Sequence, residues 1–325
     1  MRELNWACIG CGHIAGEMAQ AFEQKGRSFY SVYSRTNENA ASFAKRWGIK
    51  KVYASPDELF GDENVDVVYI ATPHNRHIEY ILKAAENGKH VLCEKAITLN
   101  SDELSRAVEA CRKNGVILAE AMTIYHMPVY KKVFECIENG SLGAMKLIEV
   151  NLGSNKDYDM TNRFFNPDLA GGAMLDIGVY ALSFVRRFMS ESPRVAGSSV
   201  KLAPTGVDEQ ELMLLENGLG EAASVTLSLT AKLPRTATVS FENGYAEFEN
   251  YNRSHRATVT YHNGENVIFE SEGEISPLSY EIDDMEEAVN GGENRMMLGY
   301  TADVMKIMTE MRRQWGVKYP EEENV

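Results

Sequence analysis

Residues 4–16 read LNWACIGCGHIAG, a short apolar segment that runs straight into a G-x-G-x-x-A turn. The residues after it, 17–24, are typical of a helix. In a strand–turn–helix unit of this kind, Gly10 permits the tight turn, Gly12 lets the backbone approach a pyrophosphate, and Ala15 lets the helix pack on the strand. The free N–H groups and the dipole at the helix start then favour phosphate. The stretch therefore predicts a dinucleotide-binding fold.

The composition fits a globular protein of about two domains. The chain has 325 residues, of which 44% are hydrophobic and 25% charged, and its formal net charge is −14. The acidic balance argues against a nucleic-acid surface. No apolar run approaches the ~20 residues that a membrane helix needs, and the first strand begins too close to Met1 for a signal peptide. Five scattered cysteines fit a reducing compartment. We therefore expect a cytoplasmic protein with no membrane partner.

Strands and helices alternate through residues 1–121. Residues 65–71 form a nearly continuous apolar run, which is typical of a strand buried on both faces of a parallel sheet. Further strands are expected at 29–34, 52–54, 90–93 and 116–120, and helices at 37–47, 75–87 and 101–113. The pattern predicts an α/β domain, a doubly wound parallel (Rossmann) sheet that binds ligands at the carboxyl ends of its strands.

Residues 122–325 show a different pattern of expected helices and strands, typical of an α+β domain. A long helix is expected at about 174–188, and turns such as Asn243-Gly244 and Asn263-Gly264 separate strand-like segments. The expected strands are 212–215, 224–229, 236–241, 245–248, 257–261 and 267–269, and helices return at 283–289 and 301–315. We expect a large, mostly antiparallel sheet with one open face, in a domain for substrate binding and oligomerisation.

The open face predicts a homo-oligomer. Segments such as 226–229 and 237–240 alternate apolar with small polar residues. A broad sheet covered by helices on one side leaves its other face bare to water, and an exposed apolar patch of that size marks an interface. Closed two-fold pairing is the commonest solution, so a homodimer is expected first and a homotetramer second.

The end of the second strand distinguishes the two nicotinamide cofactors. An acidic residue there binds the ribose 2′-hydroxyl of NAD, whereas a basic residue accommodates the 2′-phosphate of NADP. Here the segment is Ser34-Arg35-Thr36, with no carboxylate before Glu38. Arg35 offers a planar donor fork that suits phosphate, and the two hydroxyls add donors. NADP is therefore favoured, and NAD stays possible because Arg35 could instead stack on the adenine.

Two further segments carry candidate catalytic groups. Cys93-Glu94-Lys95 ends the fifth strand, at the edge where doubly wound folds bind ligands. Asp176 and Tyr180 are four residues apart, so on a helix they share one face. A tyrosine has an unperturbed pKa near ~10, and a close ammonium such as that of Lys95 would lower it. The phenol could then exchange the proton of a substrate hydroxyl while a hydride moves to or from nicotinamide.

Four motifs in this order resemble the Gfo/Idh/MocA oxidoreductases over essentially the whole chain. They are Gly10 to Ala15, Ala71-Thr72-Pro73-His74-Asn75-Arg76-His77, Gly88 to Lys95, and Gly171 to Gly178. The resemblance implies that Lys95 is the catalytic lysine and Asp176 an active-site carboxylate. The expected cofactor-binding residues are Gly10, Gly12, His13, Ile14, Ser34, Arg35, Thr36, Thr72, Pro73, Asn75, His77, Glu94 and Lys95.

Two positions refine the resemblance. Most of the family has histidine four residues after the aspartate, whereas this chain has Tyr180, as does the branch that resembles dimeric dihydrodiol dehydrogenase and NADP-dependent xylose dehydrogenase. That branch prefers NADP, in agreement with Arg35. The family motif reads Glu-Lys-Pro, whereas in this chain Ala96 follows Lys95 in place of the proline. The resemblance implies an NAD(P)-dependent oxidoreductase acting on a CH–OH or C=O group of a sugar, polyol or cyclic diol.

The sequence leaves other interpretations open. A cofactor-sensing regulator on the same fold is the alternative function, although a sensor would not need a catalytic lysine and proton donor. Cys8 and Cys11 form a C-x-x-C without a second pair, so neither a metal nor a redox site is expected there. His74 and His77 are three residues apart, a spacing for which cofactor contact or a helix start is favoured over a metal. Arg163 either faces the ligands or forms a surface ion pair.

Overall fold

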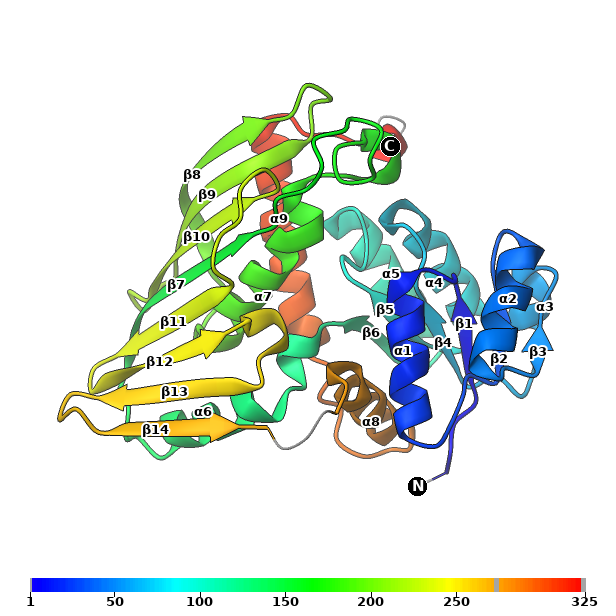
Figure 1. Ribbon diagram of the computed structural model, residues 1–325, viewed down its shortest axis with the longest axis horizontal. Coiled ribbons are helices and arrows are strands. Elements are labelled where there is room, and N and C mark those ends of the chain that lie inside the picture. The colour runs from blue at the N-terminus through cyan, green and yellow to red at the C-terminus, as the bar shows by residue number, and fades with distance from the viewer. Residues whose placement is uncertain (1, 272–274, 323–325) are drawn as a thin grey trace. The chain divides into compact units, whose positions relative to one another are not determined.

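The computed structural model describes residues 2–271 and 275–322. Within them the chain forms two compact units, residues 2–126 with 275–298 and residues 127–271 with 299–322. Figure 1 shows the elements of both units. Each unit is built on one large sheet.

The first unit is built on a parallel sheet whose described strands follow the order β3-β2-β1-β4-β5-β6. Its strands are β1 (Trp6–Ile9), β2 (Ser31–Tyr33), β3 (Lys51–Val52), β4 (Val67–Ile70), β5 (His90–Glu94) and β6 (Leu118–Ala121). The helices between them are α1 (His13–Gln24), α2 (Asn37–Trp47), α3 (Pro56–Phe60), α4 (His77–Glu86) and α5 (Ser101–Lys113). Every residue of β1 and β4 is buried, as expected for central strands of such a sheet. The predicted doubly wound sheet is confirmed.

Helix α8 (Pro277–Val289) belongs to the first unit, although the division at residue 121 placed it in the second domain. Its apolar side chains join the buried cluster that contains Trp6 and the inner face of α1. Trp6 Nε1 donates to Glu286 Oε1 at 2.8 Å, and Arg27 pairs with the same carboxylate at 2.8 Å. Helix α8 therefore lies beside α1 and covers apolar surface that the first 126 residues leave bare (Figure 1).

The described strands of the second unit form a sheet in the order β14-β13-β12-β11-β7-β10-β9-β8. They are β7 (Met145–Gly153), β8 (Arg194–Leu202), β9 (Asp208–Glu216), β10 (Ala222–Ser228), β11 (Thr236–Phe241), β12 (Gly244–Glu249), β13 (Arg256–Tyr261) and β14 (Asn266–Glu270). Strands β7 and β10 pair in parallel, and the other neighbours pair antiparallel. The predicted large, mostly antiparallel sheet is confirmed.

The alternation that predicts the other strands of this sheet misses β7 and β8. Strand β8 lies at the edge, and its residues are exposed or half-buried throughout, so it has no regular apolar face. In β7 the alternation is interrupted by Leu147, which is exposed. Both strands form because they pair with neighbouring strands in the sheet, and their sequences show no regular alternation that would predict them.

Helices α6 (Pro128–Glu138) and α7 (Val179–Phe188) pack on one face of this sheet. Helix α9 (Leu298–Trp315) lies beside α7, where Arg186 pairs with Asp303 at 2.8 Å (Figure 1). The helix expected at 174–188 is present, but its first five residues, Met174–Gly178, form a π-helical turn. Turns of this kind are rare and occur frequently at functional sites.

One stretch among the described residues, Pro167–Phe188, is long and apolar enough to cross a membrane by length and composition alone. This corrects the expectation that no apolar run approaches that length. Of its most apolar window, 83% is buried inside the protein. The stretch contains α7, which packs against β7 and β10, so its apolar character is that of a core helix.

The other face of the sheet carries side chains that are exposed or half-buried. In the segments 226–229 and 237–240 the apolar residues, such as Leu227 and Val239, are buried toward the helices. The residues that expose apolar surface on the open face are Leu147, Leu212, Leu214, Tyr245 and Ile268. The alternation of apolar and polar residues therefore predicted correctly that the sheet has two different faces. The apolar surface of the open face, however, does not come from the segments 226–229 and 237–240.

Candidate active site

The carboxyl ends of four parallel strands lie side by side in the first unit. The registers Ile9↔Tyr33, Ile9↔Ile70 and Ile70↔Cys93 align the ends of β1, β2, β4 and β5. The predicted cofactor residues follow directly or form these ends: Gly10, Gly12, His13, Ile14, Ser34, Arg35, Thr36, Thr72, Pro73, Asn75, His77, Glu94 and Lys95. The fold thus gathers them along one edge of the sheet, where doubly wound folds bind nucleotides.

The turn between β1 and α1 has the shape that its glycines predicted. Gly10 has φ +101°, and a Cβ on it would lie 2.4 Å from the Ala71 carbonyl oxygen. Gly12 is the N-cap residue of α1, and no described atom lies within 4 Å of the position its Cβ would take. The space in front of this helix start is therefore open to a ligand, and any side chain at residue 12 would enter it. His13 is exposed and lies 3.0 Å from Glu17.

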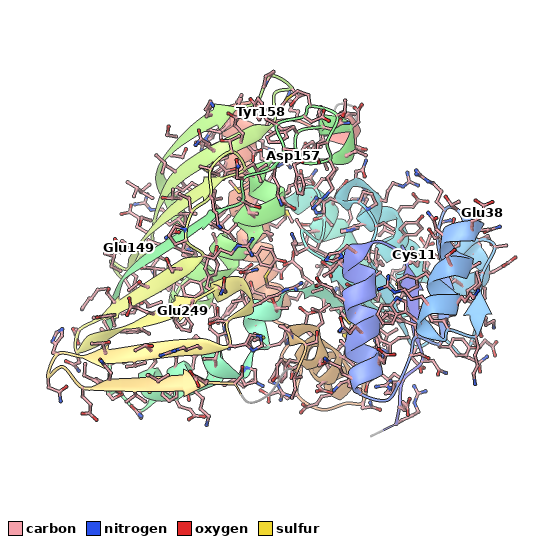
Figure 2. The ribbon with its side chains drawn as sticks, viewed as in Figure 1. Cys11, Glu38, Glu149, Asp157, Tyr158 and Glu249 are labelled. Atoms are coloured by element: carbon pink, nitrogen blue, oxygen red, sulfur yellow. The ribbon has the colours of Figure 1, made fainter. Side chains whose placement is uncertain are left out.

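The end of β2 meets this turn through Cys11 and Ser34. Burial raises the pKa of Cys11 to about 11, and the Ser34 hydroxyl beside it acts in the opposite direction. Arg35 and Thr36 are exposed, and Thr36 occupies the N-cap position of α2. Glu38 lies in the first turn of α2, and Figure 2 shows it on the surface of the first unit. Arg35 is thus an exposed cationic side chain that directly follows the end of β2.

His77 joins the loop after β4 to the segment after β5. Its ring is fully buried, with Nδ1 3.0 Å from the Ala96 oxygen and Nε2 2.9 Å from the Thr72 oxygen. Burial lowers the pKa of His77 below its ordinary value, against the pull of these carbonyls. Because both ring nitrogens face backbone, His77 holds the loop that carries Thr72 against the segment that follows Lys95.

Glu94 and Lys95 lie at the carboxyl end of β5. The Tyr69 hydroxyl donates to Glu94 Oε1 at 2.5 Å, and burial, followed by the Glu94 charge, raises the pKa of Tyr69 well above its ordinary value. The Lys95 amide donates to Glu94 Oε2 at 3.3 Å. The peptide bond between Lys95 and Ala96 is cis. Glu94 is thereby fixed as a buried carboxylate, and Lys95, half-buried, follows it.

The second unit places Asp176 in the π-helical turn and Tyr180 in the first turn of α7. Asp176 is 9% exposed, and its Oδ1 lies 3.2 Å from Arg163 Nη2. Arg163 itself is more than half exposed and lies over the Phe164 ring, 4.1 Å from its centroid. Of the two alternatives for Arg163, the structure therefore shows an ion pair, and its partner is the predicted catalytic carboxylate.

The sequence did not single out Asp208 and Tyr251, which lie near this helix start. Asp208 Oδ2 accepts from the Met174 amide at 2.6 Å. Burial raises the pKa of Tyr251, and the nearby Tyr180 phenol adds to the effect. The burial of Asp208 and its bond to a residue 34 positions away in the chain are not evident from the sequence, so no local signal identifies it.

Both halves of the chain match models of one protein family. Residues 4–122 match the GFO/IDH/MocA model described as an oxidoreductase family with an NAD-binding Rossmann fold. Residues 130–247 match the model of the GFO/IDH/MocA C-terminal domain.

Individual relatives agree with these matches. The trans-1,2-dihydrobenzene-1,2-diol dehydrogenase of Mus musculus is 31% identical over 252 residues, 76% of this chain and 74% of its own length. The D-xylose 1-dehydrogenase (NADP(+)) 2 of Haloferax volcanii is 29% identical over 266 residues, 81% of this chain and 82% of its own. The solved aldose-aldose oxidoreductase of Caulobacter crescentus has a TM-score of 0.87 at 21% identity, covering 97% of this chain and 98% of that one, and so shares the fold.

Proposed function

The chain belongs to the GFO/IDH/MocA oxidoreductase family, and from this premise we propose that it is an NADP-dependent dehydrogenase or reductase. Its substrates would be sugars, polyols or cyclic diols, at a CH–OH or C=O group. The observation that carries the proposal is the edge of the first sheet, where the open helix start at Gly12 and the Glu94-Lys95 pair follow neighbouring strands. The dehydrogenases named among the relatives act on a diol and on a sugar, which supports this substrate class.

The described residues at this edge fit a dinucleotide. Gly12 leaves room for a pyrophosphate at the start of α1, where unpaired N–H groups and the helix dipole favour anions. The first turn of α1 contains no acidic residue that would repel a phosphate. Ser34 and Arg35 end β2 without a carboxylate, which supports NADP over NAD. The cofactor name of the Haloferax relative points in the same direction.

The catalytic roles follow from the chemistry of three side chains. The nicotinamide supplies or accepts the hydride. We assign Tyr180 the exchange of the substrate hydroxyl proton and Lys95 the positive charge that favours the phenolate. Asp176, held by Arg163, is assigned the binding of a substrate hydroxyl. Buried, partnered carboxylates of this kind bind hydroxyl donors with charge-assisted hydrogen bonds.

The experiment is a fluorescence titration with NADPH and NADH, followed by turnover measurements on a panel of sugars, polyols and cyclic diols. The proposal expects tighter binding of NADPH and reduction of NADP⁺ by at least one class of the panel. Cofactor binding without turnover on any class would contradict the proposal and favour the cofactor-sensing regulator.

We also propose that the chain forms a homodimer through the open face of its second sheet. The five exposed apolar residues of that face, Leu147, Leu212, Leu214, Tyr245 and Ile268, come from four strands of one sheet. Exposed apolar side chains gathered on one face of a sheet are typical of interfaces. A two-fold axis across the face would bury it against its own copy.

A further inference from the structure

The helix that carries Asp176 and Tyr180 begins without a side-chain cap from its own N-cap residue. The first N–H groups of any helix lack partners within the helix, and buried ones must find them elsewhere. Here the Met174 amide donates to Oδ2 of Asp208, the first residue of β9, at 2.6 Å. Asp208 is fully buried. A carboxylate at a helix start also interacts favourably with the dipole of the helix.

The two glycines before this helix each allow a close approach, Gly172 to Asp208 and Gly171 to the 163–166 loop. Gly172 has φ +117°, and a Cβ on it would lie 2.6 Å from Asp208 Oδ1. Gly171 has no such φ, but its Cβ would lie 2.7 Å from the Arg163 carbonyl oxygen. Glycine is therefore required at both positions for the backbone to approach Asp208 on one side and the 163–166 loop on the other.

The residues around Asp208 also hold the loop that carries Arg163. The Tyr158 hydroxyl donates to Glu209 Oε2 at 2.8 Å, and the Thr205 hydroxyl donates to the Phe165 oxygen at 2.6 Å. Figure 2 shows Tyr158 in the loop that follows β7. The segment 205–209 thus anchors the Met174 amide, two residues before Asp176, and also the loop that bears the ion-pair partner of Asp176.

The far side of the turn is closed by α9 and the residues after it. The Tyr319 hydroxyl donates to the Gly171 oxygen at 2.6 Å, and the buried Arg312 lies over the Tyr319 ring and pairs with Glu322. Burial, followed by the charge of Asp208, raises the pKa of Glu211 well above its ordinary value. The Glu211 side chain therefore lies close to Asp208 in the same buried environment.

We propose that Asp208 is a positioning residue for catalysis, which fixes the helix start bearing Asp176 and Tyr180 through the Met174 amide. The proposal rests on the proposed function, in which those two residues are catalytic. Asp208 touches neither reacting group, so its effect is on their placement. Small displacements of positioned groups lower kcat strongly.

The test compares Asp208→Leu with Asp208→Asn. Asparagine keeps an oxygen that accepts from Met174 and adds an N–H that can be donated to Glu211, whereas leucine has similar volume and accepts nothing. We expect Asp208→Asn to keep kcat within about threefold and Asp208→Leu to lower kcat at least tenfold, with unchanged NADPH affinity in both. A folded Asp208→Leu protein with wild-type kcat would overturn the proposal, as would an equal loss in both variants.

Two further measurements keep the outcomes distinct. Hydrogen exchange of the peptide containing Met174 should be faster in Asp208→Leu than in wild type and Asp208→Asn, whether or not a substrate has been found. If wild type turns over no substrate but the variants show this exchange pattern, the proposed function is contradicted and the positioning role of Asp208 is not. Unchanged exchange in Asp208→Leu overturns that role. If Asp208→Leu does not fold, Tyr319→Phe, which removes only the bond to Gly171, should speed that exchange and lower kcat, and no change in either overturns the proposal.

Discussion

Replacing Gly12 by alanine should separate cofactor binding from stability. Gly12 has φ −80° and ψ −172°, which alanine adopts without strain. Its Cβ would meet no described atom within 4 Å. The methyl group would instead occupy the space at the start of α1 in which we place the pyrophosphate.

The expected change in stability is small because two effects oppose each other. Alanine restricts the unfolded chain and so stabilises the protein by about 0.4–1 kcal/mol. Alanine is also a poorer N-cap residue than glycine, which costs about 0.5–1 kcal/mol. The free energy of unfolding should therefore stay within about 1 kcal/mol of wild type. NADPH affinity should fall at least tenfold, which corresponds to about 1.4 kcal/mol.

The matched control is Gly10→Ala in the same turn. Its Cβ would lie 2.4 Å from the Ala71 oxygen at a φ of +101°, and a strained φ alone costs about 1–3 kcal/mol. Gly10→Ala should therefore lower stability clearly, whereas Gly12→Ala should not. Chemical denaturation and fluorescence titration with NADPH measure the two effects. A stable Gly12→Ala protein that binds NADPH like wild type would refute the placement of the pyrophosphate.

Four other outcomes are expected. Wild type should bind NADPH at least tenfold more tightly than NADH, about 1.4 kcal/mol, and Arg35→Ala should erase this preference in titration; an unchanged ratio rules out a contact of Arg35 with the 2′-phosphate. Lys95→Ala and Tyr180→Phe should each lose ~10²–10⁴-fold in kcat with little change in NADPH affinity, and near-normal kcat in Tyr180→Phe would reduce Tyr180 to a packing residue. The raised pKa of Glu211 means that its proton stabilises the fold fully below the ordinary glutamate pKa, and that this stability is lost as pH rises toward the folded pKa. Glu211→Gln should therefore gain stability relative to wild type as pH rises above the ordinary glutamate pKa, and a pH-independent difference in denaturation would speak against a raised pKa of Glu211. Light scattering should give a dimer, which Leu214→Glu dissociates, and a wild-type mass near 36.3 kDa at micromolar concentration would count against the interface.

Local patterns in the sequence were enough to predict the sheet of the first unit. The turn at Gly10 and Gly12 depends on residues adjacent in the chain, and the burial of β4 follows from an uninterrupted apolar run. The cover that α8 provides could not be predicted, because it depends on contacts such as Trp6 with Glu286, 280 residues apart.

The second unit shows the same limit. The sequence predicted a helix over about 174–188 that places Asp176 and Tyr180 on one face, but not the π-helical turn. The Asp208 anchor could not be predicted either, because it is a bond between separate elements. Strand alternation identified two faces of the sheet without saying which one the helices cover. The exposed Leu212 and Leu214 were therefore not recognised as the apolar surface of the open face.

Hydride transfer itself can be followed with a substrate from the panel that carries deuterium on its CH–OH carbon. After incubation with NADP⁺, mass spectrometry of the nicotinamide product measures whether the label has moved. We expect wild type to form NADPH that carries one deuterium, and Tyr180→Phe to form almost none. Reduced cofactor without deuterium, or no reduction with any member of the panel, would contradict it.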